Sequence, residues 1–288
     1  MRRRGGWVLV VPALLMFLGF ALIPLIGVLV LSFTDWNGIS ATAHWVGLRN
    51  FRDLFGSEIA RSALWHTLEL AAVYVVVVNV IGLGLALALH RTVRSRNLLR
   101  AIFFAPVILS PLATAYIWRF IFDYTGPLNG FLHSVGLDSL QRPWLGDPGF
   151  ALWAVAAVFV WQNAGLSMSF YLAGLQSIPE ELDEAAVVDG ASTLLRLRAV
   201  TLPLLAPAMT ISVAFATIQA FRIFDTVIGL TNGGPGSATE TLTTQLFNQG
   251  FAANRFGYAA AFALVLVVLI ATVSIAQISL LRAREARL

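Results

Sequence analysis

Long apolar stretches separated by short polar connections dominate this sequence. They lie at about 7–33, 64–89, 99–122, 150–172, 204–230 and 258–281. A helix of about 20 apolar residues is enough to cross the hydrocarbon core of a bilayer, and each stretch reaches that length. The pattern therefore predicts an all-α, polytopic membrane protein with six transmembrane helices.

The first apolar stretch has two possible interpretations. It follows Met1-Arg2-Arg3-Arg4, and Ala41-Thr42-Ala43 resembles a cleavage site, as in a signal peptide. The apolar core of a signal peptide is only about 7–15 residues long, however. The longer stretch here favours an uncleaved first span, which Pro12 and Pro24 are expected to bend.

One connection, residues 177–207, is polar and has helix signals of its own. Pro179 suits the first position of a helix, Gly190 can supply a left-handed residue that ends it, and Ser192 can cap a second helix. The pattern predicts a helix, a glycine turn and a second helix between two spans. The first of these helices carries five acids and no base: Glu180, Glu181, Asp183, Glu184 and Asp189.

That acidic helix is unsuited to an anionic membrane surface, which would repel it. Ala185 and Ala186 are small enough to let a partner backbone approach closely. We therefore expect it to contact a protein partner. An ordinary solvated loop is the alternative, which charge alone would favour.

Composition supports the membrane assignment and excludes several functions. The chain of 288 residues is 58% hydrophobic and 12% charged, against about 25% charged in soluble domains. It has no cysteine and no lysine. A thiolate metal site and a P-loop, which needs lysine at the phosphates, are thereby excluded, so ATP hydrolysis would need another chain.

Arginine is distributed unequally between the two sides of the predicted topology. Twelve arginines lie on the side of the termini and the acidic loop, and five lie on the other. Because positive residues are enriched in cytoplasmic loops, both termini and the acidic loop are predicted to be cytoplasmic in a cell (inner or plasma) membrane. The basic charge thus reflects orientation and not nucleic-acid binding.

The acidic connection resembles a known signature. Glu184-Ala185-Ala186, then Asp189-Gly190-Ala191, then Thr201-Leu202-Pro203 is similar to the "EAA" motif of ABC importer membrane subunits. In that family the loop is the coupling helix, which docks into a cleft on the cytoplasmic ATPase. The resemblance assigns coupling to Glu184, Ala185, Ala186, Asp189, Gly190 and Pro203. Leu197 departs from the family pattern, which often has an aromatic residue there.

Other segments resemble the carbohydrate, maltose-permease-like group of these importers. They include Gly47-Leu48-Arg49-Asn50-Phe51, Trp118–Asp123 and Phe224-Asp225-Thr226 with the turn that follows. The resemblance implies a partner permease of the same kind, two ATPase subunits that use ATP and Mg, and an extracytoplasmic sugar-binding protein. It also implies an N-terminal region 1–62 and a permease core 63–288, with the coupling loop at 177–203.

Polar side chains inside the spans are candidates for a substrate site. Gln162 and Asn163 precede the loop and Gln219 follows it, each near an aromatic residue. Amides and aromatic faces suit a sugar, although such amides also join helices to one another by hydrogen bonds. In the resembling permeases these two spans build the sugar site, which implies Gln162, Asn163, Leu166, Thr217, Gln219 and Ala220.

No catalytic set is visible. The four histidines are scattered without metal-ligand spacing, and Gly165-Leu166-Ser167-Met168-Ser169 lacks the second glycine of a nucleophile elbow. An intramembrane enzyme is therefore disfavoured, and no metal or cofactor site is expected in this chain. An ion-coupled secondary transporter of a small polar solute remains the alternative, although no internal repeat is evident.

Overall fold

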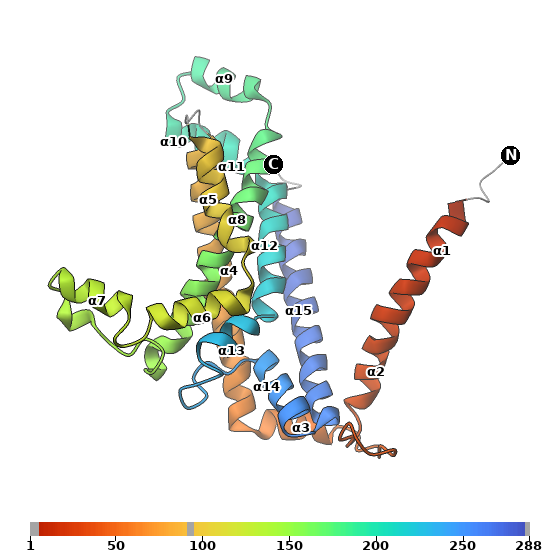
Figure 1. Ribbon diagram of the computed structural model, residues 1–288. Helices are drawn as coiled ribbons and strands as arrows, with labels where there is room; N and C mark the ends of the chain where they lie inside the picture. The colour runs from red at the N-terminus through yellow and green to blue at the C-terminus, as the bar shows by residue number, and fades with distance from the viewer. Residues whose placement is uncertain (1–5, 91–94, 286–288) are drawn as a thin grey trace. The chain divides into compact units, whose positions relative to one another are not determined.

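The computed structural model describes residues 6–90 and 95–285 (Figure 1). Within these stretches the regular elements are all helical, and Thr34 and Trp45 form an isolated β bridge. The all-α prediction is confirmed. The chain forms two compact units that share α15 (Phe256–Glu285). One contains the chain up to Arg61 with Leu242–Val268, and the other contains Ser62–Thr241 with the end of α15.

The first unit begins with the N-terminal span. α1 (Gly6–Phe17), the π turn η1 (Leu18–Leu22) and α2 (Ile23–Leu31) follow one another without a break. Pro24 lies in the first turn of α2 and has no N–H to donate, so the regular α-helical ladder is interrupted beside the π turn. None of the residues from 10 to 31 is buried, as suits an apolar helix that faces lipid.

A polar junction holds the end of α2 in the same unit. The Asn50 amide donates to the carbonyls of Ser32 and Thr34 at 2.9 and 2.8 Å, and the Gly257 N–H donates to the Trp36 carbonyl at 2.8 Å. A side chain at Gly257 would collide with the Thr34 carbonyl, so the second position of α15 requires glycine. The unit also contains α3 (Arg49–Gly56), α14 (Leu242–Phe247) and the π turn η4 (Asn248–Ala252).

The second unit is organised around α8 (Pro148–Gln176), which packs against α5 (Arg96–Ile108) and α12 (Ala206–Phe221) and lies beside α4 (Glu58–His90). Asp147 caps α8 by accepting from the Gly149 N–H at 2.8 Å. Glycine permits the close packing: a Cβ at Gly82 would collide with Ser167. A Cβ at Gly84, by contrast, would meet nothing within 4 Å, so this glycine is not needed for packing within the chain.

The predicted span 99–122 is not one straight helix. α5 (Arg96–Ile108) and α6 (Pro111–Ile121) meet at a 99° bend. Pro111 disfavours helical backbone at the residue before it, and Ser110 is accordingly extended, with ψ of 128°. After α6 the chain continues into α7 (Pro127–Ser134) and the 3₁₀ turn η2 (Asp138–Leu140).

The predicted span 204–230 is also divided. α12 ends at Phe221, and α13 (Asp225–Leu230) begins after a short break. Before α12 come α10 (Thr193–Arg196), the π turn η3 (Leu197–Thr201) and α11 (Leu202–Leu204). This preceding segment bends by 67° where it meets α12. Prolines at the second positions of α11 and α12 cannot donate to the preceding turns, which accounts for the irregular backbone.

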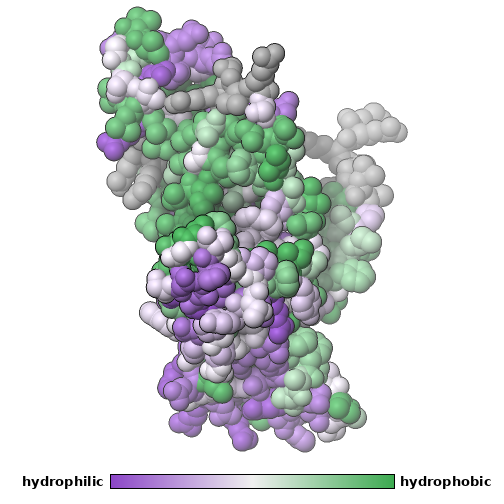
Figure 2. Space-filling view, turned by 60° about the vertical axis from the view of Figure 1, so that its left-hand side comes forward, coloured by the Kyte–Doolittle hydropathy of each residue, from purple (hydrophilic) through white to green (hydrophobic). Residues whose placement is uncertain are grey.

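Four helical stretches among the described residues are long and apolar enough to cross a membrane, and the number is six if each bent pair is one span. The four are Val10–Leu31, Glu58–His90, Pro148–Gln176 and Phe256–Ala283. The polytopic membrane prediction is confirmed. Figure 2 shows largely hydrophobic surface below an end of the second unit where α9 (Glu180–Val188) exposes hydrophilic and hydrophobic residues together.

Candidate coupling loop and intramembrane polar site

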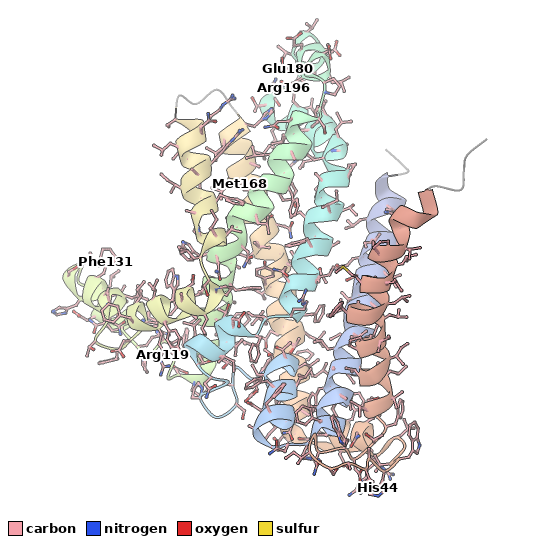
Figure 3. The ribbon with its side chains drawn as sticks, turned by 45° about the vertical axis from the view of Figure 1, so that its right-hand side comes forward. His44, Arg119, Phe131, Met168, Glu180 and Arg196 are labelled. Atoms are coloured by element: carbon pink, nitrogen blue, oxygen red, sulfur yellow. The ribbon has the colours of Figure 1, made fainter. Side chains whose placement is uncertain are left out.

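The polar connection after α8 contains the predicted helix–turn–helix. α9 (Glu180–Val188) begins directly after Pro179, which is extended with ψ of 132° and so lies one residue outside the helix. The acids Glu180, Glu181 and Asp183 lie in the first turn, where the helix dipole favours negative charge. Figures 1 and 3 place α9 at the opposite end of the second unit from α6 and α7.

Gly190 ends α9 in a Schellman motif. Its φ of +79° is left-handed, and the Gly190 and Ala191 amides donate to the carbonyls of Val187 and Ala186 at 3.0 and 2.9 Å. Ser192 then caps α10 by accepting from the Leu195 N–H at 3.3 Å. The predicted glycine turn and serine cap are both confirmed.

The residues assigned to coupling are mostly exposed. Glu184, Ala185, Asp189 and Gly190 are exposed, and Ala186 is half-buried. Pro203 lies apart from them, half-buried in α11. The apolar side chains of α9 are exposed as well, Val188 to 87%. α9 thus presents both acidic and apolar side chains at its surface.

A cavity of about 480 Å³ lies between α9, the end of α4 and the α10–η3 segment. Leu87, Leu175 and Leu197 contribute apolar lining. Charged lining comes from Glu180, Asp183, Glu184 and Arg196. α9 is thus separated from the apolar core of the unit by a space with both apolar and charged walls.

Gln162 joins α8 to the break between α5 and α6. It is only 4% exposed, and its Nε2 donates to the Leu109 carbonyl at 3.1 Å, with Thr114 Oγ1 at 3.5 Å. The Leu109 carbonyl lies at the bend, where the helical ladder ends. The amide therefore provides a hydrogen-bond partner for a carbonyl at the break between the two helices.

Asn163 and Leu166 lie on another side of α8. Both line a cavity with Phe170, Phe215 and Ser212, and the Asn163 amide donates to the Phe159 carbonyl at 2.9 Å. The cavity measures about 10 Å³, which is room for about one water and not for a sugar ring.

The three α12 residues of the predicted sugar site differ in surroundings. Thr217 is 1% exposed, and its Oγ1 donates to Gln277 Oε1 of α15 at 2.7 Å. Ala220 is fully buried, whereas Gln219 is half-buried. The structure thus places Gln162 and Thr217 in links between helices, which is the alternative that the sequence left open.

Comparisons with known proteins decide what kind of protein has this architecture. A family model described as "Binding-protein-dependent transport system inner membrane component" matches residues 79–284. The chain belongs to this family. The permease is therefore a multi-pass inner-membrane subunit, and the non-catalytic membrane component, of an ABC importer that works with a periplasmic binding protein and an ATPase.

Relatives extend the likeness over nearly the whole permease. It is 34% identical over 280 residues to the probable starch degradation products transport system permease protein AmyD of Thermoanaerobacterium thermosulfurigenes, covering 97% of this chain and 94% of that protein. It is 31% identical over 281 residues to the trehalose/maltose transport system permease protein MalF of Thermococcus litoralis, covering 97% and 94%.

A solved structure has the same fold. The permease superposes with a TM-score of 0.84 on a chain from the crystal structure of a bacterial ABC transporter involved in the import of the acidic polysaccharide alginate. The sequences are 24% identical, and the match covers 96% of this chain and 94% of the other. The predicted permease fold is thereby confirmed.

The permease also contains polar links that sequence reasoning missed. Tyr171 Oη donates to Asn79 Oδ1 at 2.8 Å, and the hydroxyls of Ser167 and Ser212 lie 3.1 Å apart. These contacts join α8 to α4 and to α12. The small residue Gly82 beside Ser167 is a partial signal for close packing, but the partners depend on tertiary structure.

Proposed function

We propose that this permease forms half of the translocation pathway of an ATP-driven carbohydrate importer, with α9 as its coupling helix. The observation that carries the proposal is α9 itself. It has no buried residue, ends in a Schellman turn directly before the serine-capped α10, and presents Glu184 and Ala185 at one end of the second unit. An exposed helix with a defined C-terminal end suits docking on a partner.

The relatives support a carbohydrate as substrate. Their names include starch degradation products, trehalose/maltose, multiple sugars and arabinooligosaccharides. All of these are rich in hydroxyl groups, which amides recognise by donating and accepting hydrogen bonds. The substrate class we propose is therefore a sugar or related carbohydrate.

The proposed assembly contains a second homologous permease, two cytoplasmic ATPase subunits and an extracytoplasmic sugar-binding protein. Because the chain has no lysine for a P-loop, ATP and Mg²⁺ would be used by the ATPase subunits. The arginine asymmetry supports a topology with both termini and α9 in the cytoplasm. Residues 1–62 would form the N-terminal region and 63–288 the permease core.

The proposed pathway includes Gln162, Asn163, Leu166, Thr217, Gln219 and Ala220. Support comes from α8 and α12, which pack together and carry all six. The cavity beside Asn163 is too small for a sugar in this conformation, at about 10 Å³. Sugar passage would therefore require the two helices to separate, or a pathway completed by the second permease.

The test is uptake by the reconstituted complex. Proteoliposomes would contain both permeases and the ATPase subunits, and radiolabelled maltotriose or arabinotriose would be supplied with the cognate binding protein. We expect uptake that requires internal ATP and the binding protein. Uptake driven by a proton or sodium gradient without ATP would instead identify an ion-coupled secondary transporter.

A further inference from the structure

An ion pair joins the two helices of the coupling loop. Asp183 of α9 and Arg196 of α10 lie 13 residues apart in sequence, and the distance from Oδ2 to Nη1 is 2.7 Å. Their side chains are 53% and 23% exposed. Figure 3 shows Arg196 at the same end of the unit as Glu180. The pair spans the loop that the Gly190 turn closes.

The acidic side chains near Arg196 come from α9. Glu180, Asp183 and Glu184 line the same cavity as Arg196, and His90 at the end of α4 lines it as well. The Arg196 Nε is buried and has no hydrogen-bond partner among residues 6–90 and 95–285. The guanidinium is therefore partly withdrawn from water, and Asp183 is the carboxylate that meets it directly.

The orientation of α9 on the unit is not determined by buried contacts. None of its residues is buried, and a cavity separates it from the apolar wall formed by Leu87 and Leu175. Packing of apolar side chains, which normally determines how a helix sits on a domain, is weak here. A specific contact between α9 and α10 can then decide the tilt and rotation of α9.

We propose that Arg196 is a positioning residue for energy coupling. Its ion pair with Asp183 holds α9 at a fixed angle to the α10–α12 segment, so that movement of α9 on the ATPase is passed to α12. This inference rests on the proposed coupling function of α9. Without the pair, α9 still forms and docks, but it rotates on its connections and transmits less of the movement.

If the ion pair only supported the fold, its loss would lower the stability and the activity of the complex together. This ion pair is partly exposed, and such pairs contribute little to folding stability, so its loss should shift the unfolding temperature of the complex by no more than about 2 °C. Coupling between two sites commonly changes a binding affinity by about 5- to 150-fold, and we expect an effect on transport at the lower end of that range. A large loss of coupling with little loss of stability therefore distinguishes positioning from support of the fold.

The experiment uses the complete complex with both permeases, the ATPase subunits and the binding protein. The variants are Arg196→Gln, Asp183→Asn and the exchanged pair Asp183→Arg with Arg196→Asp. Arg198→Gln is the matched control, because Arg198 is exposed two residues further along. The readouts are ATPase stimulation by maltotriose-loaded binding protein, sugar transported per ATP hydrolysed, and ATPase retention.

We expect each single variant to reduce sugar transported per ATP by about five- to tenfold, with the ATPase retained. The exchanged pair should restore at least half of the wild-type ratio, and Arg198→Gln should match wild type. Unchanged coupling in Arg196→Gln would overturn the proposal. So would impaired single variants that the exchanged pair does not rescue, because the interaction between the two residues would then not matter.

A spectroscopic measurement separates this proposal from the proposed function. The chain has no cysteine, so Val188→Cys provides a single site in it for a nitroxide, with cysteine-free partner subunits. We expect Arg196→Gln to sharpen the electron paramagnetic resonance spectrum of this label, because α9 gains rotational freedom. An unchanged spectrum would refute the positioning role, whereas absence of ATP-dependent uptake in the wild-type complex would refute the importer function.

Discussion

Replacement of Gly190 by alanine perturbs the backbone of the coupling loop without a steric collision. A Cβ at this position would meet nothing within 4 Å, so the cost comes from the φ of +79° alone. An L-residue in the left-handed region costs about 1–2 kcal/mol, a factor of roughly 5–30 in the equilibrium between the closed and open turn. Asparagine tolerates this region better, so Gly190→Asn should cost less.

The cost should appear in coupling and not in overall stability. α9 has no buried residue, so opening of the Schellman turn exposes no core. We expect Gly190→Ala to reduce sugar-stimulated ATP hydrolysis at least threefold, Gly190→Asn to reduce it less, and neither to shift the unfolding temperature measurably. Gly190→Asp should be more severe than asparagine, because it adds another acid next to Asp189.

A second glycine provides the matched control. Gly136 after α7 has a φ of +76°, also faces open space, and donates to the His133 carbonyl at 3.0 Å in a similar helix end. Gly136→Ala carries about the same backbone strain at the opposite end of the second unit. Normal sugar-stimulated activity in Gly190→Ala, or equal loss in Gly136→Ala, would refute a specific role for the Gly190 turn.

Two further predictions concern the membrane-spanning part of the permease. Gly165→Ala should destabilise the complex by about 1–3 kcal/mol, because the added Cβ collides with backbone of α5; thermal unfolding measures this, and Gly84→Ala, which faces open space, should be close to neutral. Asn163→Leu and Gln219→Leu should lower uptake while the complex still assembles, because each removes amide groups from the proposed pathway; unchanged uptake kinetics in both would place the sugar elsewhere.

The ends of the coupling loop were predictable because local chemistry determines them. Pro179, Gly190 and Ser192 act through their own backbone or nearest turn, so a single sequence contains the signal. The pair Asp183–Arg196 was not predictable, since 13 residues separate the two side chains and only the folded turn brings them together.

The breaks in the spans were partly predictable. Pro111 is a visible signal for extended backbone at Ser110, yet composition alone cannot show whether a proline kinks a span or divides it. In the structure the Gln162 amide satisfies the Leu109 carbonyl at the bend, a contact 53 residues apart in sequence. Tertiary partners of this kind make a sharp break tolerable in lipid, and they also explain why an intramembrane amide need not bind substrate.

The most direct test of the central claim is charge reversal at the exposed Glu184 of α9. Affinity purification of Glu184→Arg from membranes that contain both permeases, the ATPase subunits and the binding protein measures ATPase retention and sugar-stimulated hydrolysis together. If α9 is the coupling helix, the variant will insert normally but lose the ATPase, or retain it without stimulation by sugar. Full retention with normal stimulation would contradict the account, because α9 would then be a solvated connection between two membrane helices.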